Sequence, residues 1–302
     1  MERLLITLIL VCTMNNITNA QNPFYGQYHT PHEAVPFDRI ETEHYEPAIL
    51  EGIKLQNAEI EAIIQNPEKA DFSNTIEAFE ASGELLDKVV AVFGNMLSAE
   101  TNDDLQELAQ KIMPLLSEHS NNITLNEKLF ARVKEVYNQK ETLQLTQEQK
   151  QLLENAYNSF IRHGANLEGE AREEYRRLTT ELSKLTLTFS ENNLKETNAY
   201  QMLLTKKESL AGLPEIIIEA AAETAKNEEK EGWAFTLHAP SYIPFMTYSD
   251  NRDLRQKLYM AYNTKCTHDN EFNNIDIVKK IANTRMKIAQ LLGYKDYAEY
   301  TL

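Results

Sequence analysis

The sequence predicts a mainly α fold, a bundle of many helices with a few short β-strands. Apolar residues recur three and four positions apart through most of the chain, which is the period of an amphipathic helix. Prolines and capping signals separate these periodic stretches from one another. Strand candidates are confined to 199–205 and 232–238; in the second, Trp233, Phe235 and Leu237 alternate with the residues between them.

Five helices are predicted in succession between residues 43 and 163. The capping box Thr146–Gln149 opens the last of them, and a similar box at Asn74–Glu77 opens the second. Asn66-Pro67 ends the first, because proline cannot continue the helical hydrogen-bond ladder. The five apolar stripes fall at about 45–64, 85–96, 105–115, 126–140 and 147–163.

The longest predicted helix runs from about 169 to 196. Its apolar residues alternate three and four apart, which suits a narrow seam against one antiparallel partner helix. This seam contains Tyr175, Leu178, Leu182, Leu185 and Phe189.

The remainder of the chain predicts four further helices. One spans 214–226 between the two strand candidates, and Asp250 caps another beyond Pro244. A helix over about 277–292 follows, and Tyr297 lies near the start of a last one.

Charge and cysteine content narrow the possible functions. The 302 residues include 46 acidic and 30 basic side chains, a formal charge of −16, so the surface repels phosphate backbones and nucleic-acid binding is not expected. The excess of acid is typical of a soluble protein. Because Cys12 lies in the leader described below, Cys266 has no partner for an internal disulfide and reads as a quiet, partly buried residue.

The first 20 residues predict a secretory signal peptide. Met1-Glu2-Arg3 is a short charged region, and Leu4 to Cys12 is an apolar run too short to span a bilayer. Thr18-Asn19-Ala20 ends in a small residue, as a cleavage site requires. We therefore expect export, to the periplasm or otherwise out of the cytoplasm, and no later transmembrane segment.

The stretch HEAVP at 32–36 begins like the zinc motif H-E-x-x-H. That motif works because two histidines four residues apart share one face of a helix. Here Pro36 replaces the second histidine, and the flanking prolines favour an extended loop. His29 and His32 are therefore interpreted as solvated loop residues rather than a metal pair, and no histidines elsewhere lie four apart.

Other ionisable residues give weak signals. The acid pairs at 103–104, 173–174 and 228–229 lie in charged helix segments and predict solvated faces. His238 lies in the second predicted strand and is a candidate core or cleft residue, while His268 with Asp269 is a candidate C-terminal cap. From the residues alone we assign no catalytic residue and no metal ligand, and we leave the substrate-binding residues undefined.

Six segments, in order along nearly all of 22–302, resemble one protein family. They are Asn22-Pro23-Phe24, PFDRIETEHYEPAILEGI at 36–53, NTIEAFEASGELLDKVVAVF at 74–93, the helical stretch 101–137, PSYIPFMTYSDNRDLRQKLYMAY at 240–262 and IANTRMKIAQLLGYKDYAEYTL at 281–302. They resemble the N-terminal portion of a bacterial peptidyl-dipeptidase of the thimet oligopeptidase and oligopeptidase A family of zinc metallopeptidases.

The resemblance implies a two-lobed, zincin-like peptidase with a deep channel. Residues 21–230 would form the N-terminal helical lobe, and 231–302 would begin the catalytic domain, truncated before the zinc site. The family's H-E-x-x-H and downstream Glu lie in its C-terminal half, so zinc is expected only in the full-length protein and none is expected on this chain. Short peptides and the missing catalytic lobe are the implied partners, and the lobe would cover the apolar faces around 254–262 and 277–292.

Three functions remain open at this point. The chain resembles part of an exported enzyme that releases dipeptides from the C-terminus of short peptides and is expected to be inactive alone. The second hypothesis is an oligopeptidase A-like endopeptidase, and the third is a non-catalytic helical peptide-binding module. The reading frame downstream of Leu302 separates the third from the other two.

We predict that the expressed protein is cleaved between Ala20 and Gln21 during export. The apolar run is recognised and removed only when the chain is translocated. Terminal sequencing of protein from the cell envelope fraction should begin at Gln21. An intact Met1 on protein recovered from the cytoplasm would contradict export.

Overall fold

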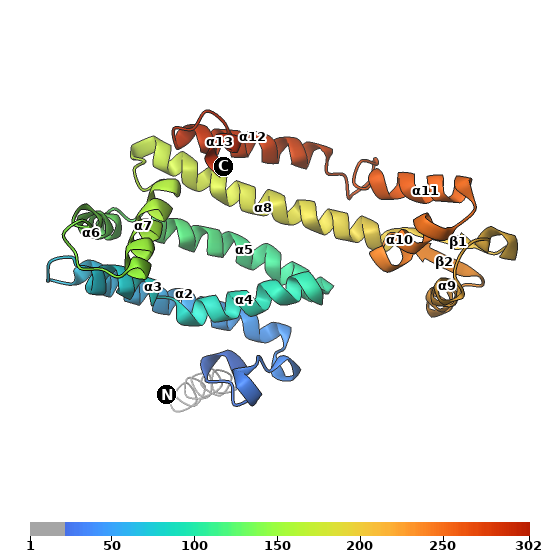
Figure 1. The fold of residues 1–302 in the computed structure, drawn as a ribbon, viewed down its shortest axis with the longest axis horizontal. Helices are drawn as coiled ribbons and strands as arrows, with labels where there is room; N and C mark the ends of the chain where they lie inside the picture. The colour runs from blue at the N-terminus through green and yellow to red at the C-terminus, as the bar shows by residue number, and fades with distance from the viewer. Residues whose placement is uncertain (1–21) are drawn as a thin grey trace, which may run out of the picture. The chain divides into compact units, whose positions relative to one another are not determined.

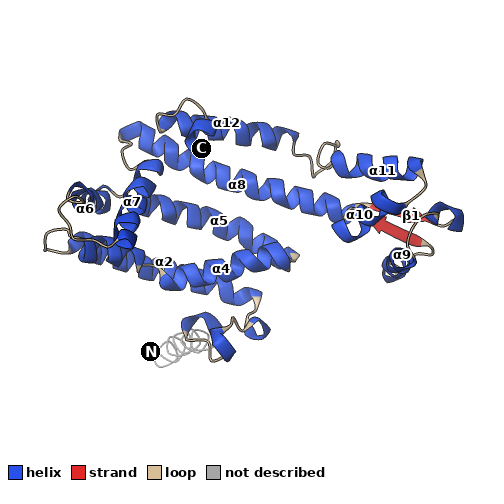
Figure 2. Cartoon of the chain, viewed as in Figure 1, coloured by secondary structure: helices blue, strands red, loops and turns tan. Residues whose placement is uncertain are grey.

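The computed structural model describes residues 22–302, and the predicted signal peptide at 1–20 lies outside them. The predicted fold class is confirmed: the described residues are mainly α, with one two-stranded antiparallel sheet (Figures 1 and 2). Of these residues, 22–183 and Lys287–Leu302 form one compact unit and Lys184–Met286 form a second. No helix within 22–302 is both long enough and apolar enough to cross a membrane.

The first unit is built from helices that follow one another closely. A segment of three short 3-10 turns precedes them, at Pro23–Tyr25, Pro31–Glu33 and Phe37–Arg39. The helices are α2 Thr42–Gln65, a π-helical turn Phe72–Glu77, α3 Ala78–Glu80, α4 Glu84–Ala99, α5 Asp103–Thr124, α6 Glu127–Asn138, α7 Gln147–Arg162, the first part of α8 Gly169–Ala199, the end of α12 Ile275–Leu291 and α13 Tyr297–Thr301.

Local capping explains where most of these helices begin. The predicted box at α7 is confirmed, since Thr146 Oγ1 accepts from Gln149 N at 3.3 Å and Gln149 Oε1 accepts from Thr146 N at 3.0 Å. The predicted box at Asn74–Glu77 is wrong. Asp71 and Asn74 form the box instead, at 2.7 and 3.0 Å, because the π-helical turn starts three residues earlier than the apolar pattern indicated.

The main core of the first unit lies between α2, the π-helical turn, α6 and α7. Phe160 of α7 stacks on Phe130 of α6, with ring centroids 5.8 Å apart, and Phe79 tilts against it at 5.4 Å. The largest buried side chains of this core include Ile63, Phe72, Ile76, Leu129, Phe130, Val133, Leu153 and Phe160. Burying each of them stabilises the fold by roughly 1.5–3 kcal/mol.

The helices α2 and α4 approach each other closely at Gly52. Gly52 of α2 is buried, and a Cβ atom at that position would lie 2.9 Å from Leu86 Cα and 3.0 Å from Leu86 N. A side chain at residue 52 would therefore push against backbone, which cannot rotate away. Glycine at this position is what lets the two helices meet.

The predicted seam on α8 finds its partner in α12, which runs in the opposite direction (Figure 1). Within the first unit, Tyr175 and Leu178 are buried against Ile288 and Leu125, with Leu182 packed at the edge. Phe189, which the pattern also placed in the seam, is exposed. The seam therefore ends before the last turns of α8.

The second unit contains both strands. β1 Gln201–Leu204 and β2 Trp233–Thr236 pair antiparallel, with Met202 opposite Phe235. Both strands fall inside the predicted stretches, and the predicted domain boundary at 230/231 lies between these paired strands, within this unit. The other elements are the later part of α8, a 3-10 turn Lys207–Leu210, α9 Glu215–Asn227, α10 Ala239–Tyr248, α11 Arg252–Asn263 and the first part of α12.

Two details of this unit differ from the sequence predictions. α10 contains both Pro240 and Pro244, although the sequence predicted the next helix beyond Pro244. Pro240 lies in the first turn, where its missing N–H has no helical partner to lose. The cap of α11 is Asn251 rather than Asp250, since Asn251 Oδ1 accepts from Leu254 N at 3.1 Å.

The apolar faces near the C-terminal end are only partly exposed. Leu258, Ile281 and Ile288, which were expected to remain uncovered, are buried. Tyr262, which was also expected to be uncovered, is exposed, and so are further large apolar side chains of α10, α11 and α12: Ile243, Tyr248, Tyr259, Met260, Ile275, Val278 and Met286.

We predict that Gly52→Ala destabilises the protein by about 1–3 kcal/mol, because the added methyl group overpacks the crossing of α2 and α4. Gly94→Ala in α4 is the matched control, since a Cβ there meets nothing within 4 Å. The control should stabilise by about 0.5–1 kcal/mol through helix propensity. Urea unfolding of the two variants measures both changes in the free energy of unfolding. Equal stability of the two variants would contradict the claim that the close approach of α2 and α4 requires glycine at residue 52.

Candidate functional site

The HEAVP stretch is the extended loop that its prolines predict only from Ala34 on, where φ is −60° and ψ is 145°. Pro31–Glu33 makes a single 3-10 turn, with His32 and Glu33 at φ values of 58° and 55°. Both are in the left-handed region, which non-glycine residues rarely adopt in succession. The turn leaves His29 and His32 exposed, as predicted for solvated residues.

The described residues do not offer a zinc site. Within 22–302, no group of three or more histidine, cysteine, aspartate or glutamate side chains is placed to hold a metal ion. A protein zinc site needs three or four such ligands at about 2.0–2.3 Å. The residues present therefore do not fit the metal that the family resemblance implies.

The remaining candidates from the sequence lie apart from one another. His238 is exposed at the N-terminal end of α10, beyond the end of β2, so it is neither a core nor a strand residue. Of the acid pairs, Glu174 lies 2.7 Å from Arg177 and Glu228 lies 2.6 Å from Lys230, in partly exposed ion pairs. Such pairs contribute little to stability, because water and salt screen them.

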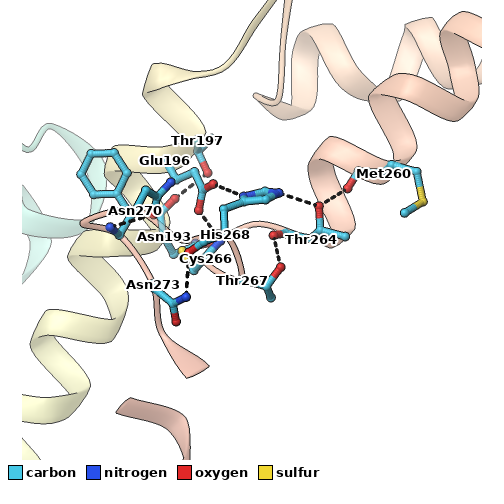
Figure 3. Close-up of polar contacts among 11 residues, drawn as sticks. Asn193, Glu196, Thr197, Met260, Thr264, Cys266, Thr267, His268, Asn270 and Asn273 are labelled. Atoms are coloured by element: carbon cyan, nitrogen blue, oxygen red, sulfur yellow. Dashed lines mark hydrogen bonds and ion pairs between the residues drawn. The ribbon is translucent and has the colours of Figure 1, made fainter. Parts of the chain in front are cut away.

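A polar network that sequence reasoning missed centres on Glu196, in the last turn of α8 (Figure 3). His268 Nδ1 lies 2.6 Å from Glu196 Oε1, and the backbone N–H of Cys266 donates to Glu196 Oε2. His268 Nε2 lies 3.3 Å from the hydroxyl of Thr264, which itself donates to Met260 O. The carboxylate thus holds the loop that follows α11, and His268 is not the C-terminal cap that was predicted.

Neighbouring contacts reinforce the same loop. Lys265 Nζ donates to Thr197 Oγ1 at 2.9 Å. The buried side chain of Asn274 accepts from Asn192 at 2.9 Å and donates to the carbonyl of Phe189 at 3.0 Å. The loop 264–274 is therefore attached to the last three turns of α8 by side chains at both of its ends.

Electrostatics in this network favour structure over reactivity. Burial, together with the nearby Glu196 carboxylate, raises the pKa of the Cys266 thiol to about 11, so the thiol stays protonated at neutral pH. Burial also raises the pKa of Glu196, but hydrogen bonds from His268 and Cys266 outweigh it and hold that pKa below its usual value. The interpretation of Cys266 as a quiet residue fits this environment.

A separate cavity of about 850 Å³ lies in the first unit, between the N-terminal segment, α2 and α4. Phe24 anchors the segment: its buried ring tilts against Tyr45 at 5.4 Å, and Tyr45 tilts against Phe93 at 5.1 Å. Lys88 of α4 reaches across and donates to the carbonyls of Phe24 and Gly26, at 3.1 and 2.8 Å. The segment is thereby fixed as one wall of the cavity.

Comparison with known proteins gives the chain its relatives. Residues 245–302 match the family described as Peptidase family M3. The chain is 36% identical over 282 residues to the dipeptidyl carboxypeptidase of Escherichia coli (strain K12), an alignment that covers 93% of this chain and 41% of that protein. It is 30% identical over 285 residues to oligopeptidase A of Salmonella typhimurium, with the same coverage of 93% and 41%.

These similarities confirm the predicted resemblance to this family of metallopeptidases, which are hydrolases. The chain spans about two fifths of the length of these curated relatives, from the coverage of 41%. The matched family segment, 245–302, includes the last turn of α10 and all of α11, α12 and α13.

We predict that Glu196→Gln loosens the loop 264–274. Both carboxylate oxygens of Glu196 accept hydrogen bonds, whereas the glutamine amide has an NH2 group in place of one oxygen, and this group cannot accept an N–H. Hydrogen exchange should become faster in 264–274 and stay unchanged in 42–162. Glu219→Gln, at an exposed position of α9, is the matched control.

The depressed pKa of Glu196 also fixes the direction of the pH dependence. The stabilisation is present above the carboxyl's unfolded pKa and is lost as pH falls through the lower folded pKa. Loop protection in the parent should therefore fall on acidification, while Glu196→Gln shows no such step. Identical exchange in the parent and in this variant would show that the carboxylate does not hold the loop.

Proposed function

We propose that this chain, which is similar to a dipeptidyl carboxypeptidase and to oligopeptidase A over 93% of its length, is the N-terminal part of an exported zinc metallopeptidase. The proposed enzyme releases dipeptides from the C-terminus of short peptides. The observation that carries the proposal is the similarity to a dipeptidyl carboxypeptidase, 36% over 93% of the chain. Identity to oligopeptidase A over the same share of the chain is lower, at 30%.

The proposed division of labour follows from the ligands that the chain offers. Residues 22–302 contain no set of side chains placed to hold a metal, and the chain spans about two fifths of its relatives. We therefore place the zinc site in the full-length protein outside these residues, and we propose that the chain alone is inactive. Its role would be to form a helical wall around the peptide substrate.

Two alternatives keep specific support. An oligopeptidase A-like endopeptidase is supported by the 30% identity to that protein over 285 residues. A non-catalytic helical peptide-binding module is supported by the lack of a metal-binding group among the described residues together with a cavity of about 850 Å³.

We predict that the purified chain, supplied with zinc, hydrolyses neither N-acylated tetrapeptides nor longer blocked peptides. A protein that continues along the reading frame past Leu302 should hydrolyse them, and mass spectrometry of the products identifies the mode. Free C-terminal dipeptides support the peptidyl-dipeptidase, internal fragments support the endopeptidase, and a frame that stops supports the binding module. Zinc-dependent hydrolysis by the chain alone would contradict the proposal.

A further inference from the structure

The cavity in the first unit carries groups that the family resemblance does not explain. Its volume of about 850 Å³ lies within the range of small-molecule sites. Its wall combines apolar side chains with charges of both signs, among them Tyr25, Tyr28, Leu55, Glu84, Leu85 and Lys88. Leu55 has 42% of its surface exposed, so an apolar group is available to a ligand.

Lys88 brings a partly buried positive charge to this wall. Its ammonium group donates to two backbone carbonyls at 2.8 and 3.1 Å and lies 4.2 Å from the centre of the Tyr28 ring. Burial lowers the pKa of Lys88, and the nearby Glu84 carboxylate opposes that change. An ammonium group has three N–H donors, so the two carbonyls leave one donor for a further acceptor.

Tyr28 adds a second donor beside Lys88. Its hydroxyl is shielded from solvent and has no hydrogen-bond partner within 22–302. Leaving such a group unpaired costs about 1–3 kcal/mol. Burial raises the pKa of Tyr28, so the hydroxyl keeps its proton and can donate it. Once the Tyr28 side chain turns its hydroxyl toward the cavity, a ligand carboxylate would satisfy both that hydroxyl and the remaining Lys88 donor.

The rest of the wall disfavours a simple anion. Glu33, Glu51 and Glu84 all line the cavity, and only Glu51 has an ion-pair partner among the described residues, Lys54 at 2.9 Å. Glu33 and Glu84 would repel a bare carboxylate but attract an ammonium group. A ligand that fits must therefore carry one charge of each sign.

We propose that this cavity binds a zwitterion, namely a free α-amino acid or a short peptide with both termini charged. The carboxylate is held by Lys88 and the Tyr28 hydroxyl, the ammonium group faces Glu84 and Glu33, and an apolar side chain lies against Leu55 and Leu85. The site is independent of the proposed peptidase activity, because all of these residues belong to this chain and none of them has to bind zinc.

Calorimetry on the chain at pH 7 tests the ligand class. Leucine, Leu-Leu and Leu-Leu-Leu form one series, and the most tightly bound of them distinguishes an amino-acid site from a peptide site. N-acetyl-leucine lacks the ammonium charge, and leucinamide lacks the carboxylate charge. Each should bind more weakly than leucine, by about tenfold or more, since a charged hydrogen bond is lost. The proposal would be overturned if none of the three zwitterions bound, or if N-acetyl-leucine and leucinamide bound as tightly as leucine.

Two conservative variants test the assigned contacts. Tyr28→Phe removes only the hydroxyl and should weaken zwitterion binding by about fivefold or more, with little change for leucinamide. Glu84→Gln should weaken zwitterion binding without weakening that of N-acetyl-leucine. Tyr259→Phe, at an exposed position of α11, is the control and should change nothing.

Thermal unfolding of each variant shows whether the fold is kept. Parental affinity in both Tyr28→Phe and Glu84→Gln would mean that the zwitterion, if bound, lies elsewhere, and the assignment of this cavity would be wrong.

Discussion

The close crossing of α2 and α4 at Gly52 is the constraint on which the first unit's cavity depends. A Cβ atom at residue 52 would come within 2.9 Å of Leu86 Cα, so the distance between the two helices is set by the absence of a side chain. One turn or less from this crossing, α2 supplies Leu55 to the cavity and α4 supplies Lys88. A single glycine therefore determines how far apart the two helical walls stand, through packing that has little room to relax.

The third wall is held in a different way, because the N-terminal segment has only short 3-10 turns. A 3-10 turn gains few hydrogen bonds, so such a segment needs outside contacts to stay ordered. Burial of Phe24 against Tyr45 supplies the apolar contact, and the two carbonyl bonds of Lys88 fix the direction of the chain after it. Lys88 thus contributes to the fold and carries the charge that a ligand would meet, which ties the stability of this segment to the electrostatics of the cavity.

Features encoded within a few residues were predicted well from the sequence. The period of apolar residues gave most helices and both strands, and the capping box at Thr146–Gln149 is present in the structure. Errors arose where two signals of similar strength lay close together. Asp71 and Asn74 compete with the Asn74–Glu77 pattern, and Asp250 stands next to Asn251, which caps α11. The residue chosen depends on backbone geometry outside the local motif.

The candidate sites could not be predicted, because they are made by residues far apart in the chain. Glu196 and His268 are separated by 72 positions, and Lys88 and Gly26 by 62. In the sequence, Glu196 is one acid among many on a long polar helix, and Lys88 is one base beside several acids. What distinguishes them is burial, since a charge removed from water must find partners while an exposed charge need not. Partial burial with specific partners is a property of the folded chain, so a sequence of this composition predicts a solvated surface at both positions and the fold turns each into an anchoring contact.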